Sequence, residues 1–283
     1  MKRILLIPNI HKDPDLVVSH KVAELLLSEG ASLYIDEKFI SDLDAGVSVY
    51  DECTELDLII VIGGDGSILD AAKYVIERKI PILGVNLGKV GYLSEVDKDN
   101  ISVLKRLFTG DYSVEDKMLL EAERISDGRS IHSERLALND IIIGHDTFLG
   151  IAEFRLEKSG GETVKYRADG IIFSTPVGST AYSLSAGGPI VAHDIDSILV
   201  TPIAPHSFFN RSIIFNSDER LVIKNCGKTE LNVSIDGRLF GAINEGDECV
   251  VTKSEKRLKM LTFDQNSTFA TLFKKMKILE DVK

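Results

Sequence analysis

The chain has 283 residues, a formal net charge of −11 at pH 7, and 44% hydrophobic and 27% charged residues. This length suffices for two domains, each with its own core. The acidic balance excludes general nucleic-acid binding, which needs clustered Lys and Arg, although a small anionic ligand can still bind where backbone amides and a few cations converge.

Cysteine usage and apolar run lengths narrow the class of protein further. Cys53, Cys226 and Cys249 are widely spaced and form no C-x-x-C pair, which argues against a disulfide framework and a cysteine zinc site. No apolar run approaches the ~18 residues of a membrane span. The first residues are typical of a strand rather than of an apolar targeting segment. We therefore expect a soluble, cytoplasmic protein with no membrane partner.

The first half of the sequence alternates strand and helix patterns. Strands are expected at 2–7, 31–36, 58–62 and 80–85. A helix should start at Asp13-Pro14, with Pro at its first position, and end at Gly30, and another should cover 100–108. Residues 39–54 have no strong period and are expected to form a loop with a short helix. This alternation predicts an α/β domain with a parallel, doubly wound sheet, whose ligands bind at the carboxyl ends of the strands.

The most informative stretch is 57–74, which reads DLIIVIGGDGSILDAAKY. An apolar run typical of a strand buried on both faces ends at the glycines, and Ser67, with Asp70 three residues later, predicts a helix N-cap. Backbone N–H groups at such a turn suit phosphate, and the carboxylate of Asp65 suits a general base beside a phosphoryl donor. The alternative is a tight turn whose aspartate only caps the helix.

From about Met118 the pattern changes to short strands with turn signals, which predicts a β-rich second domain. We expect an α/β domain at 1–117 and a β-rich domain at 118–264. Residues 268–276 form an amphipathic pattern within a C-terminal helix at 265–283, which we expect to dock back on the first domain. Binding of this helix to a membrane surface is the alternative.

Two polar stretches in the second half indicate chemistry. Asn139 and Asp140 interrupt an apolar strand, and an adjacent amide and acid can hold a base edge and a ribose diol; a solvated bulge or edge strand is the alternative. Residues 166–189 are unusually rich in Ser, Thr and Gly, with a short helix expected from about Ser179. This density favours contacts to a hydroxylated, phosphorylated ligand, with Tyr182 placed for stacking.

These motifs together resemble the bacterial NAD kinase family. The turn at 63–66, the Asn139-Asp140 pair, the TPVGSTAY stretch at 175–182 and the VSIDG stretch at 233–237 occur in the order of that family. The resemblance implies an ATP-dependent kinase that phosphorylates the 2′-hydroxyl of the adenosine ribose of NAD, giving NADP. It also implies an NAD site between the two domains, and homodimers or homotetramers whose neighbouring subunits help to complete that site.

The resemblance also implies residue roles. Asp65 would orient the 2′-hydroxyl and accept its proton. Mg²⁺ or another divalent metal would bridge oxygens of ATP and, together with the backbone amides of Gly64 and Gly66, would neutralise the developing charge. No metal ligands are assigned. The implied pocket residues are Asn139, Asp140, Arg167, Asp169, Thr180, Ala181, Tyr182, Ser183, Ser185, Ala204 and Asp236.

Two other classes of protein share parts of this pattern. A lipid or diacylglycerol-type kinase also has the GGDG turn, but the hydroxyl-rich stretch and the lack of an apolar, membrane-facing element in the sequence favour NAD kinase. A non-catalytic dinucleotide sensor is less consistent with the intact Asp65 and its glycines. The sequence leaves open NADH as acceptor, polyphosphate as donor, the size of the oligomer and regulation by NADP or NADPH.

Overall fold

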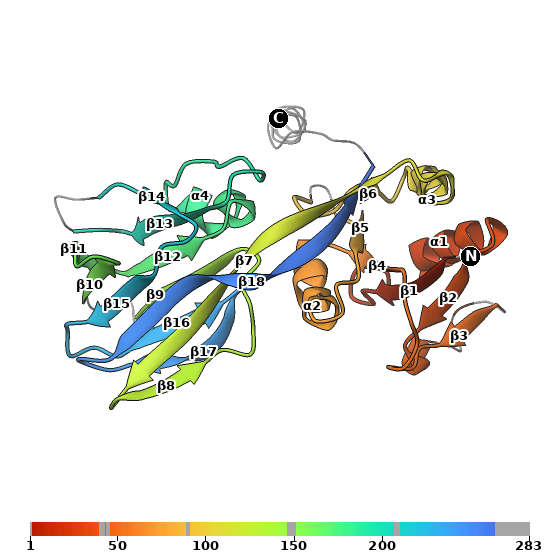
Figure 1. The fold of residues 1–283 in the computed structure, drawn as a ribbon. Coiled ribbons are helices and arrows are strands. Elements are labelled where there is room, and N and C mark those ends of the chain that lie inside the picture. Colours follow the sequence, from red (N-terminus) through yellow and green to blue (C-terminus); the bar gives the residue numbers. More distant parts are fainter. Residues whose placement is uncertain are drawn as a thin grey trace. The chain divides into compact units, whose positions relative to one another are not determined.

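The computed structural model describes residues 2–39, 43, 46–88, 91–145, 151–206 and 210–263. The chain divides into two compact units, each with its own hydrophobic core (Figure 1). Unit 1 contains Met1–Asp116 and the chain from Leu258 onward, and unit 2 is Lys117–Arg257. The helix expected at 265–283, together with its docking, lies outside the described residues.

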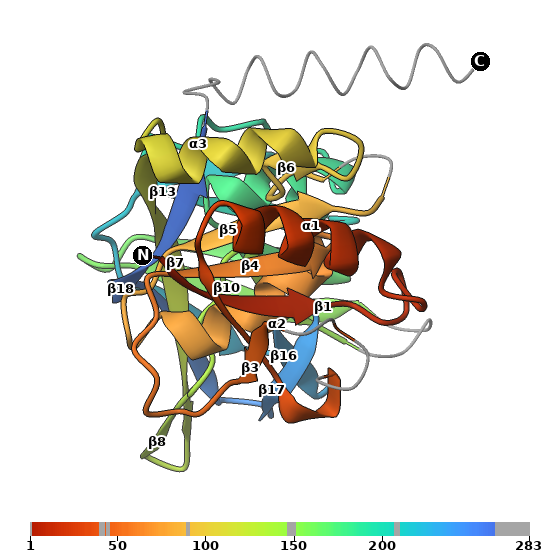
Figure 2. The ribbon, with the colours of Figure 1, turned by 90° about the vertical axis from the view of Figure 1, so that its right-hand side faces the viewer.

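Unit 1 is built on a parallel sheet with the strand order β5-β4-β1-β2-β3. Helices α1 and α2 lie on opposite faces of this sheet (Figures 1 and 2), so the predicted doubly wound α/β arrangement is confirmed. The bounds are β1 (Arg3–Pro8), α1 (Val17–Ser28), β2 (Ser32–Ile35), η1 (Glu37–Phe39), β3 (Val47–Val49), β4 (Leu58–Gly63), α2 (Asp65–Val75), β5 (Ile82–Asn86), β6 (Val96–Asp97), η2 (Ile101–Lys105) and α3 (Arg106–Thr109).

Strand β4 is the centre of this sheet. Each of its six residues is buried, because strands flank it and helices cover both faces of the sheet. Its β-branched run suits that position, since a strand covered on both sides carries apolar residues without alternation. The sequence therefore identified this element correctly.

Three local predictions in unit 1 were wrong in detail. The first helix begins at Val17 rather than at Asp13-Pro14, because Leu16 has a left-handed backbone that separates the Pro14 turn from the helix. The carboxylate of Asp13 instead accepts the N–H groups of Val18 and Ser19 at 3.2 and 2.9 Å. Residues 39–54 contain strand β3, and the helix expected at 100–108 is divided into η2 and α3.

Unit 2 consists of antiparallel layers, as the β-rich pattern predicted. A six-stranded sheet has the order β14-β13-β12-β9-β16-β17, and a second layer contains β11-β10-β15-β18 and the hairpin β7-β8. The bounds are β7 (Ser113–Ser126), β8 (Arg129–His132), β9 (Asp140–Gly144), β10 (Ala152–Lys158), β11 (Thr163–Ala168), β12 (Gly170–Ser174), η3 (Val177–Thr180), α4 (Tyr182–Ser185), β13 (Ser197–Ile203), β14 (Ile213–Asn216), β15 (Leu221–Asn225), β16 (Leu231–Ile235), β17 (Arg238–Ile243) and β18 (Glu248–Thr262).

The core of unit 2 lies between these layers. Alternate residues of β16 in one layer and of β10 in the other point into it, including Val233 and Phe154. Strand β12 is buried at every residue, because the segment containing η3 and α4 packs on its other face. Strand β18 has 15 residues and β7 has 14, so these two are much longer than the short strands that the sequence pattern predicted.

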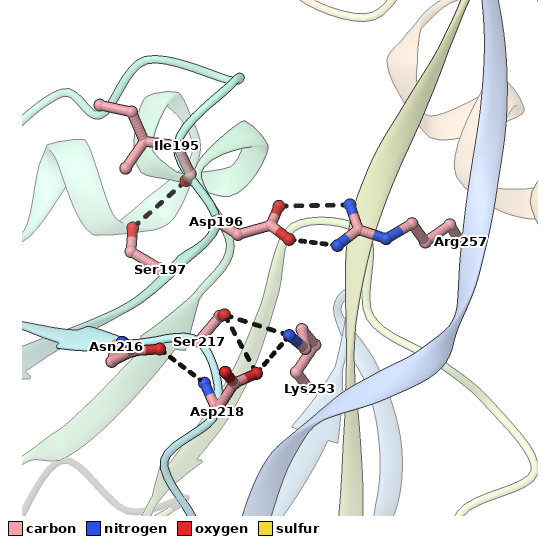
Figure 3. A network of polar contacts seen from close by, with 8 residues as sticks. All are labelled: Ile195, Asp196, Ser197, Asn216, Ser217, Asp218, Lys253 and Arg257. Atoms are coloured by element: carbon pink, nitrogen blue, oxygen red, sulfur yellow. Dashed lines mark hydrogen bonds and ion pairs between the residues drawn. The ribbon is translucent and has the colours of Figure 1, made fainter.

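A network of polar contacts ties strand β18 to the six-stranded sheet within unit 2 (Figure 3). Both guanidinium Nη atoms of Arg257 on β18 bind the carboxylate of Asp196, which precedes β13. Lys253, four residues earlier on β18, binds Asp218 and also the Oγ of Ser217 at 3.2 Å, just after β14. The pair Asp196–Arg257 is about one-third exposed, so it is less screened than a fully solvated pair.

We expect a measurable coupling energy between Asp196 and Arg257. A double-mutant cycle with Asp196→Ala and Arg257→Ala should give a coupling energy of about 0.5–1 kcal/mol in the free energy of unfolding. The two hydrogen bonds between the guanidinium and the carboxylate hold both side chains in one relative orientation. Chemical denaturation of the four proteins measures it. The exposed pair Asp36–Lys38 is the control and should give a smaller coupling. Additive effects at Asp196 and Arg257 would contradict a stabilising contact.

Candidate functional site

The GGDG turn joins β4 to α2 at the carboxyl end of the parallel sheet. Helical hydrogen bonding begins at Gly64, whose carbonyl accepts the N–H groups of Ser67 and Ile68 at 2.9 and 3.3 Å. The predicted N-cap at Ser67 was therefore wrong: Gly64 is the cap, and Ser67 lies in the first turn. Its hydroxyl accepts a hydrogen bond from Nδ2 of Asn9 at 2.7 Å, which connects the turn to the loop after β1.

The three glycines of this turn differ in the space that a side chain would find at each position. A Cβ on Gly63 would lie 2.8 Å from the Cβ of Ser67, and a Cβ on Gly64 would collide with Nζ of Lys12. Gly66, in contrast, has no atom within 4 Å of such a Cβ. Since the first N–H groups of a helix have no acceptor inside it, the open space at Gly66 leaves room for an anion at the start of α2.

The carboxylate of Asp65 is held by the backbone of a neighbouring loop. Oδ2 accepts the N–H of Tyr92 at 2.7 Å, and Oδ1 accepts the N–H of Leu93 at 3.1 Å. Gly91 permits this approach, because a Cβ there would lie 3.0 Å from Oδ1 of Asp65. A carboxylate has about four lone-pair positions, so two amides orient it and leave others for a hydroxyl proton.

In unit 2, Asp236 organises the Asn139-Asp140 stretch. Its two carboxylate oxygens accept the N–H groups of Leu138, Asn139 and Asp140 at 2.8, 2.9 and 3.0 Å. Burial raises the pKa of Asp236, and these amides oppose the shift. The family resemblance made Asp236 a pocket residue; the structure shows that its carboxylate determines the shape of the loop before β9.

Asp140 is 5% exposed and begins β9. Burial, and secondarily the charge of Asp236, raise its pKa to about 7. The preceding carbonyl of Asn139 accepts the N–H of Thr175 at 2.9 Å, and a Cβ on Gly178 would overlap this carbonyl. The structure thus brings the Asn139-Asp140 pair and the start of the hydroxyl-rich stretch together.

Several hydroxyl groups of this stretch are used inside the protein. Ser179 Oγ donates to the carbonyl of Pro176, and Ser183, which is fully buried, exchanges a hydrogen bond with Thr201 at 2.9 Å. Internal hydrogen bonds therefore account for the hydroxyl groups of Ser179 and Ser183, without a ligand. Tyr182 and Ser185 are exposed, so their side chains are accessible to a ligand.

The remaining pocket residues form a second group. Arg167 and Asp169 flank the β11–β12 turn, the N–H of Asp169 donates to the carbonyl of Ile203 at 3.0 Å, and Ala204 follows with a left-handed φ of 44°. This group lies at the Gly170 end of β12, whereas Asp140 pairs with Ser174 at the other end. Four residue steps of a strand separate these ends by about 13 Å.

Some residues of these sites were not found from the sequence. Asn9 and Lys12 beside the GGDG turn come from a loop whose local sequence carries no motif. The glycines at 88 and 91 are compatible with a pocket wall at 91–93, but the hydrogen bonds from the amides of Tyr92 and Leu93 to Asp65 have no local signal. His145 also belongs here, because its buried Nε2 lies 3.7 Å from Oδ1 of Asp169. Their position after the ends of β1, β5 and β9 was the available signal.

Within the residues that the structure describes, no group of three or more His, Cys, Asp and Glu side chains is arranged to hold a metal ion. The metal ligands, which the sequence left unassigned, therefore stay unassigned. Within the same residues, no helix has the length and apolar character needed to cross a membrane.

The α/β unit with its glycine turn and fixed carboxylate, and the β unit with its hydroxyl-rich loop, define a nucleotide-using kinase. Residues 4–112 match the family model described as ATP-NAD kinase N-terminal domain, and residues 138–263 match that of the ATP-NAD kinase C-terminal domain. The chain belongs to the NAD kinase family.

Curated relatives agree along nearly the whole chain. The NAD kinase of Natranaerobius thermophilus is 36% identical, with 98% of this chain and 98% of the relative covered. The NAD kinase of Thermoanaerobacter sp. strain X514 is 37% identical, with 98% and 99% covered. The match therefore includes both units, and the predicted family and enzyme class are confirmed.

Two solved structures share the fold. A yeast NADH kinase in complex with NADH has a TM-score of 0.82 at 23% identity, over 94% of this chain and 84% of that one. An NAD kinase from Archaeoglobus fulgidus in complex with ATP has a TM-score of 0.74 at 23% identity, over 98% and 99%. At this identity the likeness supports the two-part fold.

The raised pKa of Asp140 leads to a testable pH dependence. An unfolded aspartate has a pKa of about 3.9, so between about pH 4 and pH 7 the folded state holds more protons and the free energy of unfolding falls as pH rises. The variant Asp140→Asn cannot ionise and escapes this loss. Its stability relative to wild type should therefore be higher at pH 8 than at pH 5.

Chemical denaturation at both pH values measures this difference. Asp15→Asn, at an exposed carboxylate in the other unit, is the control for the loss of one charge. A relative stability of Asp140→Asn that is the same at pH 5 and pH 8 would contradict the assignment of a raised pKa to this carboxyl group.

Proposed function

We propose that this chain transfers the terminal phosphate of ATP to the 2′-hydroxyl of the adenosine ribose of NAD, giving NADP and ADP. Family membership supports the reaction, and the related enzymes from yeast and Archaeoglobus fulgidus were solved with NADH and ATP respectively. The observation that carries the proposal is Asp65, the first residue of α2, whose carboxylate is oriented by two backbone amides beside an open helix start.

Asp65 acts as the general base in this proposal. The ribose oxygen attacks the γ-phosphorus, the bond from this phosphorus to the β–γ bridging oxygen breaks, and the proton passes to the carboxylate. A secondary alcohol is too weak an acid to ionise first at pH 7, so proton transfer comes late, as the loose transition state collapses. The amides of Tyr92 and Leu93 keep the carboxylate in a single orientation for this step.

Unit 2 supplies the nucleoside contacts. Asn139 and Asp140 offer an amide and a carboxyl group to the base and ribose, and the exposed ring of Tyr182 offers a stacking surface. Asp236 and Ser183 contribute indirectly, since they hold the loops that present these groups. Thr180, Ala181 and Ser185 complete the same stretch.

A divalent cation, Mg²⁺ or a similar metal, enters with the triphosphate as part of the substrate. In kinase sites such a cation is bound largely by substrate phosphates and supplies charge neutralisation when present. In this proposal the N–H groups of Gly64 and Gly66, at the start of α2, donate to the same phosphates.

A homo-oligomer completes the dinucleotide site. Arg167, Asp169 and Ala204 lie at the opposite end of β12 from Asp140, so one copy does not bring both groups to the same ligand atom. A second copy supplies the distant group, and the exposed Ile190, Ile195 and Ile214 provide apolar surface for self-association.

The chain works in the cytoplasm, which suits its three free cysteines.

The direct test is incubation of the purified chain with NAD and Mg-ATP, followed by detection of NADP. Asp65→Asn should lower kcat/KM by about 10²–10⁴-fold, because an amide cannot accept the proton. Calorimetric titration should show the dissociation constant of NAD within about threefold of wild type, since the fold and the second unit are unchanged.

Asp70→Asn, on the exposed side of the same helix, is the matched control and should retain activity. Equal loss of turnover, NAD binding and stability in Asp65→Asn would identify Asp65 as a structural residue that only holds the amides of Tyr92 and Leu93. Absence of NADP with the wild-type chain, or phosphate transfer to a lipid alcohol instead, would contradict the proposed reaction itself.

A further inference from the structure

The loop between β1 and α1 is fixed to the GGDG turn by Asn9. The backbone N–H of Asn9 donates to the carbonyl of Ile62 at the end of β4, at 2.9 Å, and its Nδ2 donates to Ser67 in α2 at 2.7 Å. The loop is therefore attached on both sides of the glycine turn. Neither bond was foreseeable from local sequence, because Asn9 and Ser67 are 58 positions apart.

The same loop holds the backbone of Lys12. The carbonyl of Asn9 accepts the N–H groups of Lys12 and Asp13 at 3.0 and 2.9 Å, and Asn9 Oδ1 accepts the N–H of His11 at 3.0 Å. Asp13 is bound in turn to the start of α1 through Ser19 at 2.9 Å. The backbone of Lys12 is therefore held in place by the hydrogen bonds of this loop.

The side chain of Lys12 extends over the glycine turn. A Cβ built on Gly64 would collide with Nζ of Lys12 and would lie 3.6 Å from its Cε, so the ammonium group lies against the backbone of Gly64. Gly64 is the residue immediately before α2. A larger residue at 64 would displace this ammonium group, a small shift for the tip of a flexible side chain.

This position is electrostatically unfavourable for a cation in the protein alone. The N-terminus of a helix carries partial positive charge, and a lysine there is repelled rather than attracted. Within the described residues, Lys12 has neither a hydrogen-bond acceptor nor a carboxylate partner for its ammonium group, and the nearby Asp65 is bound to the amides of Tyr92 and Leu93. The ammonium group of Lys12 and the N-terminus of α2 therefore meet without an ion pair to Lys12 among the described residues.

We propose that Lys12 binds the β- and γ-phosphate oxygens of the nucleoside triphosphate donor. This inference rests on the proposed function and adds a residue to it. The ammonium group acts as a point charge beside the N–H groups of α2, and it neutralises charge that moves onto the leaving diphosphate as the bond to the γ-phosphorus breaks. It touches the donor and not the dinucleotide acceptor.

The test is steady-state kinetics of Lys12→Met, which removes the charge and keeps most of the side-chain length. We expect KM for ATP to rise at least tenfold and kcat/KM for ATP to fall about 10²-fold, with KM for NAD within threefold of wild type. Lys12→Arg should recover a large part of this loss. Lys21→Met, at an exposed lysine on α1, is the matched control and should equal wild type.

Two further measurements separate this role from a structural one. The affinity for a non-hydrolysable ATP analogue, measured by calorimetry, should be lower in Lys12→Met than in wild type. The difference in affinity between the two proteins should become smaller as the KCl concentration rises, because salt screens the charge of Lys12. Gly64→Ala should weaken the same binding, and the double variant should be no worse than the stronger single one, since both changes remove one contact.

An unchanged KM for ATP and an unchanged affinity for the analogue in Lys12→Met would overturn the inference. A rise in KM for NAD alone would assign Lys12 to the acceptor and would also overturn it. A wild-type chain that makes no NADP contradicts the proposed reaction, but analogue binding still tests Lys12, so the two failures are distinguishable.

Discussion

Close packing at the carboxyl end of β4 is the constraint on which the proposed site depends. Gly63 has no room for a side chain because Asn9 and Ser67 meet beside it. On the next strand, a Cβ on Gly84 would lie 2.5 Å from Ile68 Cδ1 and 2.9 Å from Ser94 Cα. Helix α2 therefore approaches the sheet closely, and the chain after β5 passes near its first residue.

This packing determines where Asp65 can point. Once α2 and the 91–94 segment are held together by glycine contacts, two backbone amides face the carboxylate. Unit 2 uses the same device, since Asp236 binds three amides of the stretch before β9. In both units backbone N–H groups hold an acidic side chain in one rotamer. The carboxylate is thus oriented by neutral donors of the main chain.

Much of the fold could be predicted from the sequence, because it depends on local periodicity. The continuous apolar run of β4, the alternation along β16 and the stop at Gly110 are all local signals. Strand β18 was underestimated because its second half, with Lys253, Lys256 and Lys259, looks solvated; its neighbours become apparent only in the fold. The start of α1 was placed too early for another reason, because nothing in the local sequence indicates the left-handed backbone of Leu16.

The site could be predicted less completely. Asp65 and the Asn139-Asp140 pair stand in recognisable motifs, whereas the arrangement around them comes from partners distant in sequence. Tyr92 lies 27 positions from Asp65, and Asp236 lies 97 positions from Asn139. Hydrogen bonds of this range depend on strand order and loop packing, for which spacing along the chain carries no signal.

The discontinuity of unit 1 has a consequence for synthesis. Leu261 and Phe263 belong to its hydrophobic core, and Met260 pairs with Ile82 on β5, although unit 2 separates these residues from the first 116. Because the ribosome synthesises the chain from its N-terminus, residues 1–116 emerge first. Their hydrophobic core stays incomplete until the whole of unit 2 and the residues after it have been made. The half that is translated later is thus the first that can finish folding, and nascent chains stalled before residue 258 expose an unfinished parallel sheet to chaperones.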